Sequence, residues 1–132
     1  DVTGVQTCAL PIWFNGWKNG YLTKHFYTEI LGLTIVQEIY RAERESYKLD
    51  LALNGIFTIE LFSFENAPKR VSGPEAAGLR HLAFEVNNIQ ETRNYFTSQN
   101  IHAEEIRMDA HTLKNYFFIA DPDDLPIEFY EK

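Results

Sequence analysis

The stretch Ile59-Glu60-Leu61-Phe62 recurs 68 residues later as Ile127-Glu128-Phe129-Tyr130. Further residues align at the same offset: Tyr27 with Tyr95, Gly32 with Asn100, and Leu33 with Ile101. Self-similarity at a fixed offset indicates a duplicated supersecondary unit. Each copy places one carboxylate inside an apolar strand pattern, where an uncompensated charge is costly. The two acids are therefore predicted to serve a common purpose, and metal coordination is the first candidate.

Composition limits the possible partners. The chain has 132 residues, enough for one domain or for two half-size modules, and a formal charge of −7. This acidity argues against nucleic acid or an anionic membrane as partner. No apolar run approaches the roughly 20 residues of a membrane helix. Cys8 is the single cysteine, which excludes a disulfide framework and suits a reducing cytoplasm.

The first 22 residues are predicted to be a non-native or irregular segment. Residues 1–12 resemble the translation of a DNA-sequencing adapter, and residues 13–22 have neither a helical nor a strand period. An opening strand is nevertheless expected around residues 8–16, because a sheet edge can pair with any extended chain.

Residues 23–64 are predicted to form a truncated first module. It has a helix over 23–31, capped by Thr23 and ended by Gly32, and strands over 33–40, 46–53 and 56–64. Asn54-Gly55 is a strong hairpin signal.

A linker over 65–78, rich in Pro and Gly, leads to a second module over 79–132. It has a strand over 79–86, a helix from Asn88 to about Gln99, and strands near 102–108, 112–120 and 125–131. The predicted fold is α+β: two βαβββ modules forming a curved mixed-sheet cup, with the first strand of module one replaced or missing.

Strand alternation places His81 and Glu128 on one face of the second module and Glu60 on the matching face of the first. Imidazole and carboxylates are ligands for Zn, Ni, Mn, Co or Fe. At the offset of 68, the counterpart of His81 is Trp13, which cannot ligate a metal. The alternatives are a strand glutamate that faces water and a histidine with a structural hydrogen bond.

Three stretches carry a resemblance to a known family: residues 24–33, residues 78–86 and residues 118–130. Together they resemble the vicinal oxygen chelate superfamily, which includes glyoxalase I, bleomycin-resistance proteins and extradiol dioxygenases, and most closely its small bacterial glyoxalase-I-like members. The resemblance implies a four-ligand metal centre of which Glu60, His81 and Glu128 are present and the first His is absent.

The resemblance also implies a function. The implied function is that of a lyase or isomerase of the lactoylglutathione lyase type that acts through a metal-bound enediolate. Glu128 is the first candidate for the base in this reaction, and Glu60 is the second. Loss of the first His is expected to impair this copy. The alternatives are a metal-free, bleomycin-resistance-like binding module, a metal-dependent ring-cleaving dioxygenase, and a chimeric polypeptide without function.

The predicted substrate is a small molecule. Candidate contacts to it come from the charged hairpin and from the two repeated strands: Arg41, Arg44, Lys48, Phe62 and Tyr130. A solvated hairpin tip is the simpler interpretation of the three cations. By resemblance, a homodimer is expected.

Overall fold

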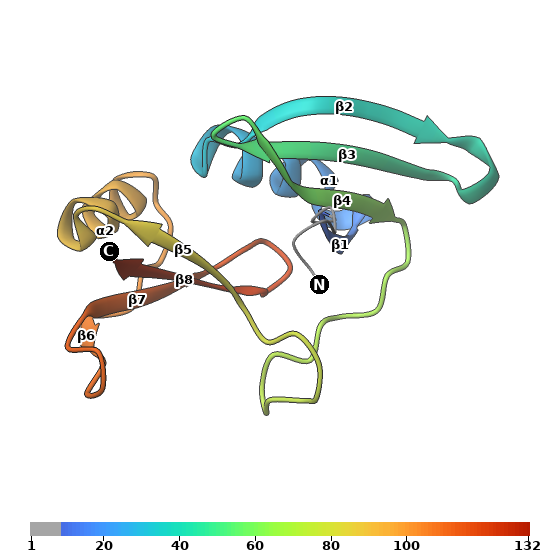
Figure 1. The fold of residues 1–132 in the computed structure, drawn as a ribbon. Helices are drawn as coiled ribbons and strands as arrows, with labels where there is room; N and C mark the ends of the chain where they lie inside the picture. The colour runs from blue at the N-terminus through green and yellow to red at the C-terminus, as the bar shows by residue number, and fades with distance from the viewer. Residues whose placement is uncertain (1–8) are drawn as a thin grey trace, which may run out of the picture. The chain divides into compact units, whose positions relative to one another are not determined.

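The computed structural model describes residues 9–132, so Cys8 and most of the adapter-like segment lie outside the described residues. The chain divides into two compact units, residues 1–68 and residues 69–132, and the boundary along the sequence falls within the predicted linker. Each unit has one mixed four-stranded sheet and one principal helix (Figure 1). The predicted α+β fold of two βαβββ modules is confirmed.

Unit 1 has the strand order β1-β4-β3-β2. Its strands are β1 (Leu10–Asn15), β2 (Thr34–Arg41), β3 (Ser46–Leu53) and β4 (Ile56–Phe64). β1 runs parallel to β4, and the other neighbours are antiparallel. The place of the opening strand is thus filled by residues 10–15, at the sheet edge where the sequence predicted that an extended segment would pair.

The hairpin between β3 and β4 follows from its turn residues. Asn54 and Gly55 both have positive φ angles, 51° and 79°, as a two-residue hairpin turn of the favoured hand requires. The predicted bounds of both strands are confirmed.

The helix of unit 1 begins earlier than the sequence indicated. Helix α1 covers Gly16–His25 and continues into a π-helical turn, Phe26–Ile30, before Gly32 ends it at a φ of 80°. The predicted start at Thr23 was wrong, since Thr23 lies inside α1 and is fully buried. Tertiary packing overrode a weak local pattern here.

The core of unit 1 lies between its sheet and its helix. Leu51, Ile59 and Leu61 are almost fully buried on one side, and Phe26 and Tyr27 on the other. Each such side chain contributes about 1.5–3 kcal/mol by leaving water. This burial fixes which face of β4 is covered, and therefore which face Glu60 occupies.

Unit 2 repeats the arrangement with the strand order β5-β8-β7-β6. Its elements are β5 (Leu82–Val86), α2 (Ile89–Ser98), β6 (Arg107–Met108), β7 (Asn115–Ala120) and β8 (Pro126–Glu131). Asn88 caps α2 as predicted, because its side chain accepts a hydrogen bond from the Glu91 N–H at 3.0 Å.

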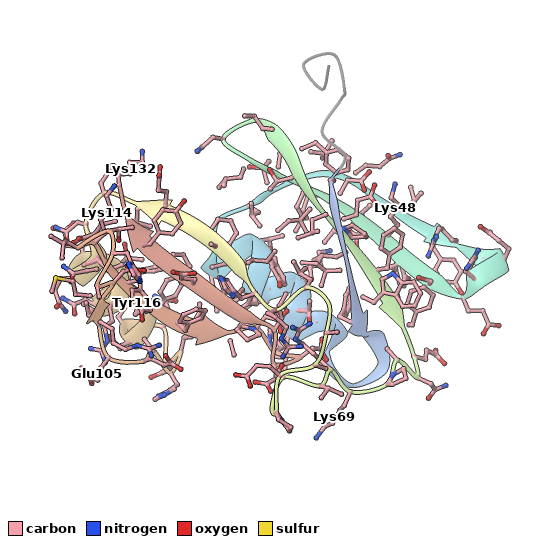
Figure 2. All side chains as sticks on the ribbon, turned by 60° about the horizontal axis from the view of Figure 1, so that its bottom comes forward. Lys48, Lys69, Glu105, Lys114, Tyr116 and Lys132 are labelled. Atoms are coloured by element: carbon pink, nitrogen blue, oxygen red, sulfur yellow. The ribbon has the colours of Figure 1, made fainter. Side chains whose placement is uncertain are left out.

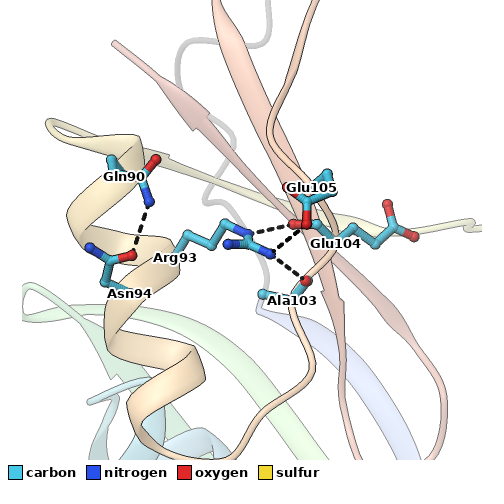
Figure 3. A network of polar contacts seen from close by, with 6 residues as sticks. All are labelled: Gln90, Arg93, Asn94, Ala103, Glu104 and Glu105. Atoms are coloured by element: carbon cyan, nitrogen blue, oxygen red, sulfur yellow. Dashed lines mark hydrogen bonds and ion pairs between the residues drawn. The ribbon is translucent and has the colours of Figure 1, made fainter.

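Of the strand predicted near residues 102–108, only the two residues of β6 are in a strand in the structure. Arg93 of α2 donates to the carbonyl oxygens of Ala103 and Glu104, at 3.2 and 2.8 Å, and pairs with Glu105 (Figure 3). These bonds hold the segment to the helix, and the Glu104 N–H also donates to the Phe118 carbonyl oxygen of β7 at 3.0 Å.

The core of unit 2 is an aromatic cluster under α2. Phe96 lies with its ring centroid 4.8 Å from that of Phe129 and 6.3 Å from that of Phe117. Ile127 and Ile119 complete this covered side of the sheet. In residues 9–132, no helix has the length and apolar character to cross a membrane.

Candidate functional site

His81 and Glu128 meet on the uncovered face of the sheet of unit 2. β5 and β8 are parallel neighbours, and their register sets Ala83 opposite Glu128. His81 lies two residues before Ala83 and so shares its face. The Nε2 atom of His81 is 2.9 Å from Oε2 of Glu128. The prediction that these two side chains share one face is confirmed, and the pairing of β5 with β8 brings them into contact. Their role as metal ligands stays a prediction.

The surroundings of this pair leave it accessible. The imidazole is 39% exposed and the carboxylate 21%. The edge of the His81 ring meets Phe118 of β7, with ring centroids 5.2 Å apart, and Phe118 stands opposite Glu128 in the register. The Phe118 ring therefore packs against one side of the imidazole, while the nitrogen and oxygen donors stay accessible to small molecules and ions.

The assignment of faces follows the apolar pattern. Ile127 and Phe129 alternate with Glu128 and lie in the core under α2, at 0% and 5% exposure. Tyr130, a predicted substrate contact, is half-buried on the same face as Glu128. The sequence therefore predicted correctly which face of β8 carries the acid.

Glu60 holds the matching position in unit 1. It lies in β4 between the buried residues Ile59 and Leu61, and the register sets it opposite Asp50 of β3. Its Oε1 atom is 3.7 Å from the Lys48 Nζ, and the same Nζ is 3.4 Å from Oδ1 of Asp50. Glu60 and Lys48 therefore face the same side of the sheet. Figure 2 labels Lys48 among the side chains.

Asp50 is not among the site residues predicted from the sequence. It is 8% exposed, and its Oδ1 atom accepts no hydrogen bond within the described residues. The Lys48 contact is an ion pair by distance, but its geometry is not that of a hydrogen bond. The signal was present, since Asp50 is a carboxylate between Leu49 and Leu51, as Glu60 is between two apolar residues.

Arg41 and Phe62 also lie on the Glu60 face. The guanidinium of Arg41 sits 4.7 Å over the Phe62 ring and donates to the Ser46 Oγ at 3.1 Å. Phe62 stands opposite Lys48 in the register. The structure thus brings three of the predicted substrate contacts together. Arg44 borders a separate hollow of about 370 Å³ beside Trp13.

The predicted counterpart of His81 needs correction. β1 places Pro11 opposite Glu60, whereas β5 places Ala83 opposite Glu128. Pro11 and Ala83 are 72 residues apart, four more than the offset of 68. The structural equivalent of His81 is therefore Ala9, directly before β1, and not Trp13.

The shift of four residues has a simple origin. The helical segment of unit 1 has 10 residues plus a five-residue π-helical turn, against 10 residues in α2. Gly32 and Asn100, which end the two helical segments with φ angles of 80° and 60°, keep the offset of 68. About one extra helical turn thus precedes Gly32 and displaces the strand before it.

A larger cavity lies on the other face of the sheet in unit 1. It has about 490 Å³ and is lined by Tyr40, Tyr47, Leu61 and the Lys24–Glu38 ion pair. It contains none of the predicted site residues. His25, His102 and His111 are exposed, as predicted. Over residues 9–132, no three His, Cys, Asp or Glu side chains are grouped to hold a metal.

Comparison with known proteins identifies the family. The model of the glyoxalase/bleomycin resistance protein/dioxygenase superfamily matches residues 22–129. The uncharacterized protein YaeR of Escherichia coli K12 is 51% identical over 111 residues, which cover 84% of this chain and 86% of YaeR. A glyoxalase family protein from Enterococcus faecalis has a TM-score of 0.83 at 38% identity, with 98% of both chains covered.

The fold extends to more distant proteins. Lactoylglutathione lyase from Agrobacterium tumefaciens has a TM-score of 0.65 at 16% identity, with 98% of this chain and 95% of the other covered, a likeness of fold alone. Because the family match spans most of the residues and both units, the chain belongs to the glyoxalase/bleomycin resistance protein/dioxygenase superfamily, the vicinal oxygen chelate superfamily.

Proposed function

We propose that this protein is a metal-dependent lyase or isomerase of the glyoxalase-I type. The observation that carries the proposal is the 2.9 Å approach of His81 Nε2 to Glu128 Oε2 on an uncovered sheet face. A nitrogen and a carboxylate oxygen at this spacing fit the donor preference of Zn²⁺, Ni²⁺, Co²⁺, Mn²⁺ and Fe²⁺.

Glu60 is the third proposed ligand. It has the position in unit 1 that Glu128 has in unit 2, opposite the opening strand of its sheet. A divalent ion bound there would polarise a substrate oxygen as a Lewis acid.

The chain's own acids would move the proton. Glu128 is the first candidate to accept a proton from a carbon next to a carbonyl group, and Glu60 is the second. Both carboxylates are partly exposed, at 21% and 25%, so a substrate can reach them. Arg41, Lys48 and Phe62 beside Glu60 and Tyr130 beside Glu128 are the proposed substrate contacts.

This copy is proposed to be a weak enzyme. Ala9 stands at the strand position equivalent to His81, so the first unit lacks the imidazole that the second unit has. Family membership supports a small-molecule substrate, a homodimer and a cytoplasmic location as parts of the same proposal.

The test combines metal analysis with an assay. The purified protein is loaded in turn with Ni²⁺, Zn²⁺, Mn²⁺ or Co²⁺, its metal content is measured, and isomerisation of the methylglyoxal–glutathione hemithioacetal is followed. We expect binding of about one ion per chain and activity that a chelator abolishes. His81→Gln should lose both, whereas His111→Gln, an exposed control, should keep both. Equal metal content in the two variants would contradict the proposal.

The main alternative is a metal-free module that binds a small ligand. One observation favours it: His81 and Glu128 are within hydrogen-bonding distance of each other and do not need a metal to be paired. In that case, ligand binding would persist in chelator, and Glu60→Gln, His81→Gln and Glu128→Gln would be silent.

A further inference from the structure

The segment before His81 is held by the guanidinium of Arg70. The Nη2 atom of Arg70 donates to the carbonyl oxygen of Leu79 at 2.7 Å and to that of Arg80 at 2.9 Å. His81 follows Arg80 directly and precedes the first residue of β5. One guanidinium therefore binds the last two carbonyl oxygens before the residue that carries the imidazole.

Arg80 returns this contact from the other end of the loop over 70–80. Its Nη2 atom donates to the carbonyl oxygens of Val71 and Ser72, each at 3.1 Å. The two ends of the loop are thus joined in both directions by hydrogen bonds from charged donors, which are stronger than those from neutral donors. The Nε atom of Arg80 is buried and has no hydrogen-bond partner within the described residues, so Arg70 makes the more complete set of contacts.

The same network reaches the turn before Glu128. The Nε atom of Arg70 donates to the Ser72 Oγ at 3.0 Å, and this hydroxyl donates to the carbonyl oxygen of Asp124 at 2.6 Å. Asp124 belongs to the turn that leads into β8, the strand of Glu128. Arg70 therefore holds the chain before His81 directly and the chain before Glu128 through one hydroxyl.

The contact between His81 and Glu128 depends on support of this kind. The paired register of β5 begins at Leu82, opposite Ile127, so His81 lies just before the regular ladder. The ends of strands and the loops beside them open more readily than the interior of a sheet. A displacement of about 1 Å is enough to spoil a functional site, and the two side chains are 2.9 Å apart.

We propose that Arg70 is a positioning residue for the His81–Glu128 pair, which it holds in place through the carbonyl oxygens before His81 and through Ser72. The inference rests on the proposed function only in taking the pair as metal ligands, because the contact itself joins two side chains of the protein. All of its members lie in unit 2.

Arg70→Lys is the test variant, because lysine keeps the charge but lacks the planar fork that reaches several acceptors at once. Arg93→Lys is the matched control. Arg93 also donates to two successive carbonyl oxygens in the same unit, those of Ala103 and Glu104 (Figure 3). Both variants lose the same kind of contact, so a general loss of stability in unit 2 would affect both.

The first measurement is the ¹⁵N chemical shift of His81 Nε2 in the metal-free protein at one fixed pH, since this nitrogen contacts Glu128. Glu128→Gln gives the shift of an imidazole that has lost its carboxylate. In Arg70→Lys the signal should move at least halfway toward that value, and in Arg93→Lys it should stay in place. An unchanged signal in Arg70→Lys, or an equal move in both variants, would overturn the positioning role.

The second measurement is Ni²⁺ affinity by isothermal calorimetry. Arg70→Lys should bind about tenfold more weakly, because residues that orient metal ligands typically contribute that much or more. Arg93→Lys should bind as the unaltered protein does.

Two outcomes distinguish failure of this inference from failure of the proposed function. If His81→Gln lowers Ni²⁺ affinity while Arg70→Lys changes neither the shift nor the affinity, the positioning role is refuted and the metal site stands. If Arg70→Lys moves the shift but His81→Gln binds Ni²⁺ as before, Arg70 positions the pair and His81 is not a ligand. Circular dichroism checks folding, and Ser72→Ala, which should move the shift in the same direction, replaces Arg70→Lys if the latter does not fold.

Discussion

The imidazole of His81 and the carboxylate of Glu128 meet at 2.9 Å across two parallel strands whose register is fixed by the aromatic core beneath them. The pair is partly exposed, so it contributes little to folding, of the order of 1 kcal/mol or less. We propose that its role is to place a nitrogen donor and an oxygen donor for a metal side by side.

Glu128→Gln is therefore expected to weaken metal binding while leaving the stability of the metal-free protein nearly unchanged. The amide keeps the shape of the side chain but removes the charge, so Ni²⁺ affinity should fall about tenfold or more. The melting temperature of the metal-free protein should change little. Calorimetry and thermal denaturation measure the two effects, with Glu131→Gln at the end of the same strand as control. A large loss of stability with unchanged affinity would show a structural role instead.

Ala9→His tests the equivalence between the opening strands of the two units. Ala9 precedes β1 as His81 precedes β5, so an imidazole there would face the same side of the sheet as Glu60. We expect metal affinity to rise about tenfold and activity to rise with it. Trp13→His is the matched comparison, since Trp13 is the counterpart by sequence offset alone.

Trp13→His should give no comparable gain, because Trp13 stands opposite Phe62, two residues beyond Glu60. Ala9 is 7% exposed, so the folding of its variant is checked by circular dichroism before affinities are compared. A larger gain from Trp13→His would mean that the offset of 68, and not the register of β1, sets the site.

Phe96→Ala should destabilise the aromatic core of unit 2. Phe96 is 2% exposed and contacts Phe117 and Phe129, so its loss creates a cavity and removes ring contacts. The expected loss is about 3–5 kcal/mol. Tyr95→Ala, a neighbouring residue at 41% exposure, should cost markedly less. Urea denaturation measures both, and equal losses would refute the assignment of Phe96 to the core.

We expect the Asp109 carboxyl, which lies away from the candidate site, to make folding stability depend on pH. Hydrogen bonds from the backbone N–H groups of Thr112 and His111 hold the pKa of this carboxyl below its ordinary value of 3.8. The folded-state pKa is thus lower than the unfolded one. The stabilising contribution is present above pH 3.8 and is lost as the pH falls through the lowered value.

The Asp109 pKa can be read from a carboxyl NMR titration. Asp109→Asn should remove this part of the acid sensitivity, because an amide does not titrate in the range. A carboxyl that titrates at or above 3.8 would contradict the prediction.

Much of the fold could be read from local pattern. The bounds of β3 and β4 follow from apolar alternation and from the Asn54-Gly55 turn, whose positive φ angles few other residues adopt at low cost. The cap at Asn88 is a local hydrogen bond and was equally readable. Each of these features depends on neighbours within a few residues.

Other features depend on contacts that are distant in the sequence. The start of α1 could not be read from residues 13–22, because their helical and strand structure is imposed by packing against β4 and its neighbours. The backbone carbonyls of Ala103 and Glu104, before β6, accept from Arg93, ten and eleven residues earlier in the chain. Asp50 carried a readable signal, but its shared ammonium required the pairing of β3 with β4.

The sequence by itself determined that two similar modules exist, and which face of each closing strand carries an acid, since apolar periodicity dictates burial. Only the tertiary structure decided that His81 reaches Glu128 and that Lys48 joins Asp50 to Glu60. It also decided that the structural equivalent of His81 in unit 1 is Ala9 and not Trp13. The physical reason is strand register. The sequence repeat has an offset of 68 residues, whereas the hydrogen-bonded register of the opening strands gives an offset of 72. About one extra helical turn in unit 1 accounts for the difference of four residues.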